Sequence, residues 1–82
     1  PQRQYEIQPA ALELHPSGEL YVLDALQNAV FVFTPQLELA RTLQLSQFGG
    51  ERSLRLTDLA FSPDGKRLYV VDELRGDLCI VE

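Results

Sequence analysis

The sequence predicts an all-β protein built from two copies of one strand–turn–strand unit, for two reasons. First, the run LELHPSGELYVLD at residues 12–24 returns as LAFSPDGKRLYVVD at residues 59–72. The offset is 47 residues at the prolines and 48 at the final aspartates, so the second copy has one more residue in its turn. Second, the apolar runs are short, are interrupted by Pro, Gly, Asp and Asn, and lack the spacing of an amphipathic helix. A repeat of this length around a strand–turn–strand core is typical of a β-propeller blade.

The first repeat contains four expected strands, which we name A to D. Pro16 and Gly18 predict a turn between strands A and B, because Pro presets φ and Gly adopts a positive φ without steric cost. Strand B is apolar over residues 20–23, which indicates a strand covered on both faces. Strand D alternates leucine with mostly polar residues, as a half-exposed outer strand does. We expect these strands at residues 11–15, 19–24, 29–34 and 37–45.

The second repeat supplies only strands A to C, expected at residues 57–62, 67–72 and 77–81. Its strand D has a counterpart at the start of the chain, because RQYEI at residues 3–7 matches RTLQL at residues 41–45. Both runs have Arg followed by polar, apolar, polar and apolar residues. The predicted order is therefore D-ABCD-ABC, two four-stranded β-propeller blades in permuted order. An N-terminal strand that completes the last blade would protect sheet edges from uncontrolled pairing.

We expect one two-blade unit with four parts. Residues 1–8 form the closing strand, 9–45 the first blade, 46–56 a long loop, and 57–82 the second blade without its outer strand. The loop is longer than the repeat needs, so we expect it to be less ordered than the strands, dispensable for folding and able to bind ligands. It should share one rim with the B-to-C turns. The expected ligand-binding residues of this rim are Gln27, Asn28, Glu51, Arg52, Glu73 and Arg75.

Charge and composition restrict the partners of the chain. A net charge of −5 argues against nucleic acid and against an anionic membrane surface, since both need an excess of Lys and Arg. No run approaches the roughly 18 apolar residues of a membrane-spanning helix. The single Cys79 lies in an apolar run and is expected to be a buried thiol. Because propeller blades bury their faces on one another, two blades alone would leave two apolar sheet faces open.

The sequence predicts no catalytic residue and no cofactor. Asp24 and Asp72 recur at the repeat period, which favours a structural role as caps of the B-to-C turns over a role as metal or substrate ligands. The lone His15 precedes the turn proline, so we expect a polar turn residue there and no zinc site. The weak candidates for a cation site are Glu13, expected to face the central channel, and Asp72 and Asp77, between which Arg75 would compete as an ion-pair partner.

The pattern of a strand, then HPSG or SPDG, then LYV-(L/V)-D resembles the NHL, YVTN and gluconolactonase-like superfamily of propellers. The phrases PAALELHP at residues 9–16 and GELYVL at residues 18–23 are most similar to the SdiA-regulated family of bacterial propellers. The resemblance implies a six-bladed propeller. It also implies a bacterial cytoplasmic or periplasmic location, and both non-catalytic binding proteins and metal-dependent hydrolases occur among such propellers.

These observations lead to an expected function. The chain is a non-catalytic propeller unit or fragment that assembles into a closed ring and serves as a binding or scaffold module. The expected partner is the chain itself, in a homotrimer of six blades or alternatively a homotetramer of eight. Two alternatives remain open: part of a metal-dependent, lactonase-like hydrolase, and an excised or engineered piece of a longer propeller. Tyr21 and Tyr69, at equivalent positions of strand B, should be buried between blades.

Overall fold

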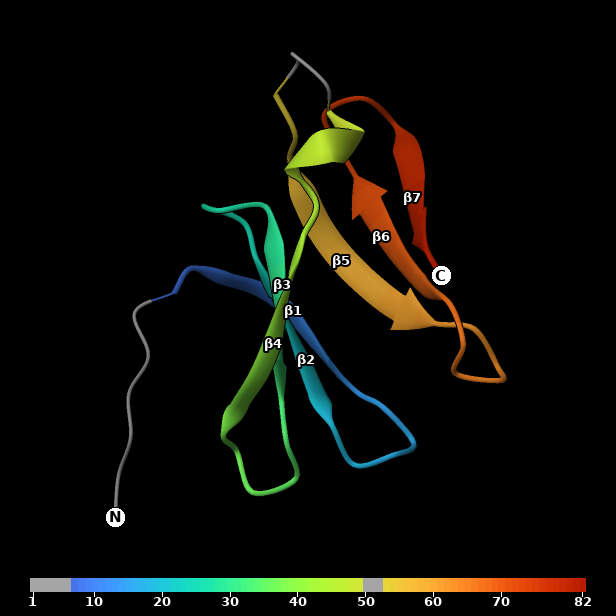
Figure 1. Cartoon of the computed structure of the whole chain (residues 1–82). Coiled ribbons are helices and arrows are strands. Elements are labelled where there is room, and N and C mark those ends of the chain that lie inside the picture. Colours follow the sequence, from blue (N-terminus) through green and yellow to red (C-terminus); the bar gives the residue numbers. More distant parts are fainter. Residues whose placement is uncertain (1–6, 50–52) are drawn as a thin grey trace.

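The computed structural model describes residues 7–49 and 53–82 and is all-β apart from one short 3-10 helix. The first sheet consists of β1 (Pro9–Leu14), β2 (Leu20–Asp24), β3 (Ala29–Phe33) and β4 (Leu39–Gln44), in that order. The helix η1 (Ser46–Phe48) follows. The second sheet consists of β5 (Leu56–Phe61), β6 (Leu68–Asp72) and β7 (Asp77–Val81). All strand pairs are antiparallel, so the prediction of two sheets with these seven strands is confirmed (Figure 1).

Most strand boundaries differ from the expected ones by one or two residues. Strand β1 starts at Pro9 because Pro9 still pairs with Asp24 across an irregularity in the ladder, and β5 starts at Leu56 for the same reason. Strand β4 starts only at Leu39, because Leu37 takes a positive φ of 65° in the preceding turn and its N–H donates to the Thr34 carbonyl. The expected closing strand at residues 1–8 lies mostly outside the described residues.

The turns between the first two strands of each sheet are equivalent, as the repeat predicts. His15 N–H donates to the Glu19 carbonyl in the first sheet, and Ser62 N–H donates to the Arg67 carbonyl in the second. The second turn spans one residue more, which is the extra residue of the second repeat. Gly18 and Gly65 take φ values of 94° and 73°, a backbone conformation that strains residues with a Cβ. The interpretation of these two turns is confirmed.

The hydrophobic core lies between the two sheets. The first sheet contributes Tyr21, Leu23, Val30 and Val32, and the second contributes mainly Leu59, Leu68, Val70 and Cys79. Strand β5 lies against β1 and β2, so the two sheets meet along their first strands (Figure 1). We call the two surfaces that meet here the packed faces, and the opposite surfaces the open faces.

The packed faces of the two sheets are opposite faces of the repeat. Tyr21 and Leu23 lie on the packed face of the first sheet, whereas their counterparts Tyr69 and Val71 lie on the open face of the second. The sheets are therefore stacked in the same direction, front to back, and not front to front. The prediction of a buried tyrosine is confirmed for Tyr21, which is 8% exposed. Tyr69 is half-buried on an open face of the single chain, and its burial between blades stays a prediction.

Candidate functional site

The B-to-C turns and the described parts of the link from β4 to β5 lie at one end of the molecule, as predicted (Figure 1). Arg75 donates from Nη1 to the Phe48 carbonyl at 3.0 Å, and its Nη2 pairs with Asp77 at 3.3 Å. Arg75 therefore holds η1 against the second sheet, a structural contact between the described parts of this rim. Of the other expected binding residues, Gln27 is exposed in its turn, and the Asn28 carbonyl accepts a hydrogen bond from Leu45 N–H. Glu73 forms an ion pair with Arg55. Glu51 and Arg52 lie outside the described residues.

The link from β4 to β5 is partly built into the core, which corrects the expectation of a dispensable loop. Leu45 and Leu56 are 2% and 1% exposed, and Phe48 and Leu54 pack against the same core cluster. The sequence pattern missed η1 because the link contains only three isolated large apolar residues before strand β5. Their burial depends on the second sheet, which is distant in sequence.

Asp24 and Asp72 cap the B-to-C turns, which confirms the structural interpretation. Asp24 Oδ1 accepts hydrogen bonds from the N–H groups of Leu26 and Gln27 at 2.8 and 3.3 Å. Asp72 Oδ1 accepts from Leu74 N–H at 3.2 Å and also from Arg55 N–H at 3.1 Å. Both carboxylates are fully buried. Each therefore satisfies backbone donors that the tight turn would otherwise leave unpaired.

The described residues contain no group of three His, Cys, Asp or Glu side chains that could hold a metal ion. Glu13 is exposed on β1, opposite Tyr21 in the strand register. Asp72 bonds to backbone, and Asp77 pairs with Arg75. Burial, reinforced by the charges of Asp72 and Asp77, raises the pKa of the Cys79 thiol, which keeps it protonated. A buried thiol in the core, as expected for Cys79, is confirmed.

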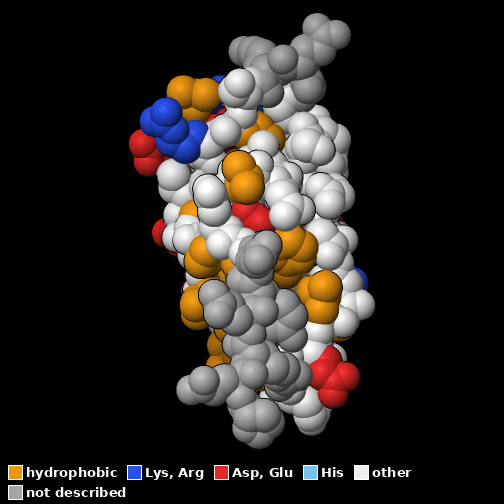
Figure 2. All heavy atoms as spheres, turned by 90° about the vertical axis from the view of Figure 1, so that its left-hand side faces the viewer, with side chains coloured by type: hydrophobic (Ala, Val, Ile, Leu, Met, Phe, Trp, Pro, Cys, Tyr) orange, Lys and Arg blue, Asp and Glu red, His pale blue; other side chains and the backbone are white. Residues whose placement is uncertain are grey.

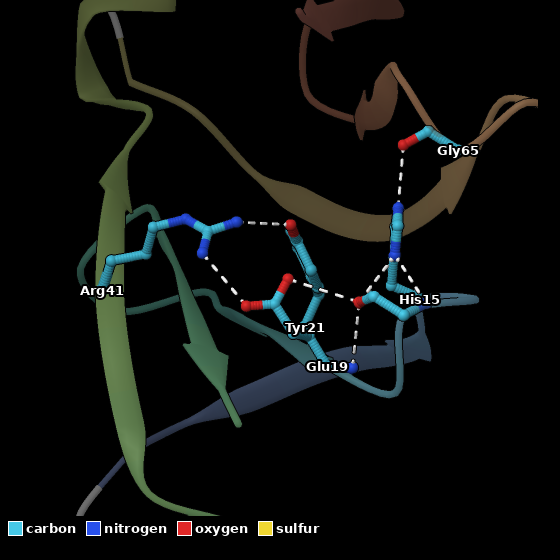
Figure 3. Close-up of polar contacts among 6 residues, drawn as sticks. His15, Glu19, Tyr21, Arg41 and Gly65 are labelled. Atoms are coloured by element: carbon cyan, nitrogen blue, oxygen red, sulfur yellow. Dashed lines mark hydrogen bonds and ion pairs between the residues drawn. The ribbon is translucent and has the colours of Figure 1, made fainter. Parts of the chain in front are cut away.

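His15 links the two sheets, a contact that the sequence did not reveal (Figure 3). Ser17 N–H donates to His15 Nδ1 at 3.0 Å, which fits the neutral tautomer with its proton on Nε2. That Nε2 lies 2.9 Å from the Gly65 carbonyl in the turn of the second sheet. The imidazole also packs edge-on against Phe61, with ring centroids 4.8 Å apart. The one available sequence signal was that His15 is not repeated, since the second copy has Ser62 at this position.

Arg41 completes this cluster from β4 (Figure 3). Its Nη2 donates to the Tyr21 hydroxyl at 2.7 Å, and its Nη1 pairs with Glu19 at 3.1 Å. The Tyr21 ring in turn packs edge-on against Phe61 at 4.7 Å. The cluster therefore joins the outer strand of the first sheet to the first strand of the second.

The open face of the first sheet is strongly apolar. A pocket of about 270 Å³ on this face is lined only by apolar side chains, among them Leu12, Leu20, Val22 and Phe33. Several hydrophobic side chains are exposed on this side of the molecule (Figure 2). Leu12 and Leu14 are 62% and 64% exposed, a large exposure for leucine on a strand. Contiguous exposed apolar surface of this kind marks interaction sites in stable proteins.

The open face of the second sheet is apolar as well. Val71, Leu78 and Ile80 are 39%, 57% and 46% exposed. Their counterparts at the equivalent positions of the first sheet are Leu23, Val30 and Val32, and each of these is 0% exposed between the sheets. Both open faces thus have the composition of a buried surface, and together they form the candidate functional site.

Comparisons with known protein families, characterised proteins and solved structures find no match to this chain. Among the residues that the structure describes, no helix has the length and apolar character needed to cross a membrane.

Proposed function

We propose that this chain is a two-blade β-propeller unit that assembles with further copies of itself into a closed, non-catalytic ring, which serves as a binding or scaffold module. The observation that supports this most directly is the relation between the packed and the open faces. Each open face carries the residues that the other sheet uses, at the same repeat positions, to form the core.

The exposed leucines of the first sheet illustrate this relation. Leu12 is 62% exposed, whereas its counterpart Leu59, 47 residues later, is 3% exposed in the core. Leu14 corresponds in the same way to Phe61, which packs on Tyr21. A second copy that placed its open face with Tyr69, Val71 and Ile80 on Leu12 and Leu14 would reproduce the junction inside one chain. Covering each such side chain stabilises by about 1.5–3 kcal/mol.

This geometry predicts head-to-tail association. The open face of the first sheet would meet the open face of the second sheet of the next chain, so the two surfaces in contact are different. Every chain added in this way leaves the same open face exposed at the end of the assembly. Only closure into a ring covers all open faces. Three chains close a ring of six blades, the number that the sequence resemblance favours, and four chains close a ring of eight. The free edge of β7 would receive residues 3–7 of the neighbouring chain, as β3 receives β4 in the first sheet.

The mass in solution tests this proposal. Light scattering should give about 28 kDa, three times the 9.3 kDa of one chain, or about 37 kDa for four chains. A folded, monodisperse species of 9.3 kDa would overturn the proposal.

Two single substitutions distinguish head-to-tail association from other modes. Leu12→Glu places a charge on one open face and Leu78→Glu on the other, so either variant alone should be a monomer. A mixture of the two should form a 1:1 dimer, because each contributes the face that the other has lost. Leu26→Glu is the control, since Leu26 is equally exposed at 66% but lies in a turn. Homodimers of either single variant would contradict the proposed arrangement.

A further inference from the structure

A second pocket lies between the two sheets, at the end opposite to the predicted binding rim. Its volume is about 270 Å³, and β4 and the β5–β6 turn contribute half of its lining residues. Three cations surround it, namely Arg41, Lys66 and Arg67, and its apolar wall contains Phe61, Leu43 and Val81. The pocket is complete within one chain and does not depend on a ring.

The charge of this pocket is unusual for the protein. Three of the seven Lys and Arg residues line it, in a chain of net charge −5. Glu19 pairs with Arg41, Glu82 lies 3.8 Å from Arg67, and the charge of Arg67 also acts on the Asp64 carboxylate, so three carboxylates lie close to these three cations. Among the described residues Lys66 has no ion-pair partner. Exposed ion pairs such as Arg67–Glu82 contribute little and exchange readily with other anions.

One further polar group of the pocket wall points to an anion. The Tyr21 hydroxyl oxygen accepts from Arg41, which leaves its own O–H able to donate. Within the described part of the chain no acceptor bonds to that O–H. Tyr21 and Arg41 lie side by side (Figure 3), and both line the pocket, so they place adjacent donors at its wall.

Two of the three cations, Lys66 and Arg67, do not repeat, in contrast to the structural residues of the two copies. The turn of the second repeat reads DGKR at residues 64–67, and the corresponding segment of the first reads SGE at residues 17–19. Residues that hold the fold, such as the turn glycine and the capping aspartate, are the same in both copies. Lys66 and Arg67 are thus specific to this junction, which is expected of binding residues and not of a repeated scaffold.

We propose that this pocket binds a small organic oxyanion, with its carboxylate or phosphate group at Arg41, Lys66 and the Tyr21 hydroxyl, and its apolar body against Phe61 and Leu43. Arginine and lysine bind such groups through charge-assisted hydrogen bonds. The half-apolar lining selects an organic anion over an inorganic ion.

The test is a titration of the protein, followed by backbone amide NMR, with benzoate, phenyl phosphate and neutral benzyl alcohol. We expect saturable chemical-shift changes at residues 61–67 and at Tyr21 with either anion, and none with benzyl alcohol. The anion that binds with the higher affinity identifies the preferred group, carboxylate or phosphate. Lys66→Gln should weaken binding about tenfold, because it removes one charge-assisted contact. Arg55→Gln is the matched control, since it removes an exposed cation at the opposite end.

Three results would overturn the proposal: no saturable shift with either anion, equal shifts with benzyl alcohol, or unchanged affinity in Lys66→Gln. Arg67→Gln provides a second variant at an exposed position, where folding should be unaffected. Because the pocket lies within one chain, the titration applies equally to the monomeric Leu78→Glu variant. Its outcome is therefore independent of whether the ring forms.

Discussion

Individual contacts at the turns decide how the two sheets are oriented on each other. The His15 imidazole lies against Phe61 and reaches the Gly65 carbonyl, while its other nitrogen is held by Ser17 N–H. A neutral imidazole satisfies both polar contacts at once. The turn of the second sheet must therefore approach His15 closely, which leaves no room for a side chain on Gly65.

Gly65→Ala should destabilise the protein more than Gly76→Ala. Both glycines have a similar positive φ, of 73° and 68°, so each alanine meets backbone strain of about 1–2 kcal/mol. A Cβ on Gly65 would also lie 2.9 Å from His15 Nε2, whereas one on Gly76 would meet nothing within 4 Å. Thermal unfolding of the two variants measures the difference. Equal losses would show that the His15 contact does not constrain the junction.

Asp64 should make the stability of the second turn depend on pH. The Ser62 hydroxyl donates to Asp64 at 2.6 Å, and this bond, with that from Lys66 N–H, holds the pKa of the carboxyl below its ordinary value. A carboxyl with a lowered folded pKa stabilises above its unfolded pKa of about 3.8, and the effect is lost as the pH falls through the folded pKa.

Asp64→Asn should accordingly lower the melting temperature slightly near pH 7, and this difference should become smaller at about pH 2.5. The effect is small because Asp64 is exposed. Melting curves of the variant and the parent protein at the two pH values provide the comparison. A difference that persisted unchanged at the acidic pH would exclude the carboxylate as its origin.

At the scale of the elements, the segment between β4 and β5 acts as a bridge between sheets. Leu45 enters the core at one end and Leu56 at the other, and η1 places Phe48 on the same cluster. Arg75 holds this segment through the Phe48 carbonyl. The length of the link therefore serves packing.

Phe48→Ala should lower the free energy of unfolding by about 2 kcal/mol. Truncation of a fully buried Phe costs about 3–5 kcal/mol, and Phe48 is half-buried. Leu74→Ala is the control, because Leu74 is 51% exposed in a turn and should change stability by less than about 0.5 kcal/mol. Chemical denaturation of both variants measures these values. An unaffected Phe48→Ala variant would restore the interpretation of the segment as a dispensable loop.

At the scale of the whole molecule, the repeat produces a stack of two sheets with an apolar open face on each side. Leu23, Val30 and Val32 are 0% exposed in the first sheet and have exposed counterparts in the second. The reverse holds for Leu12, which is exposed, and its buried counterpart Leu59. A stack of two sheets has one such junction and two open ends. The burial of apolar side chains, which stabilises the junction between the two sheets, therefore also favours association of the open faces.

Tyr69→Ala should prevent assembly and leave the fold of the single chain largely intact. Tyr69 lies on the open face and is the counterpart of Tyr21, whose ring packs on Phe61. In the ring it would pack on Leu14 of the next chain, and its loss should cost about 3–5 kcal/mol per junction. Tyr69→Phe keeps the ring and should keep the native mass. A Tyr69→Ala variant with unchanged mass would contradict the packing of this face.

Deletion of residues 1–8 should weaken assembly, since it removes the strand expected to pair with β7. The deletion also removes the Gln8 carbonyl, which accepts from Ala25 N–H at 3.0 Å. Deletion of residues 1–6 alone retains that bond and isolates the role of the strand. Light scattering over a dilution series measures the dissociation of the assembly. If both deletion variants dissociated at the same concentration as the parent protein, residues 1–8 would not form a closing strand.

The sequence by itself determined the strands, the two glycine turns and the capping roles of Asp24 and Asp72. These features depend on residues close in the chain and occur twice, so local propensity and repetition both indicate them. Only the tertiary structure decided which face of each sheet is buried, the cross-sheet contact of His15, the role of Phe48 and the grouping of Arg41 with Lys66. Each of these joins residues more than 20 positions apart, and their meeting depends on the direction in which one sheet stacks on the other. An alternating strand pattern distinguishes the two faces of a strand but contains no information on what will cover them.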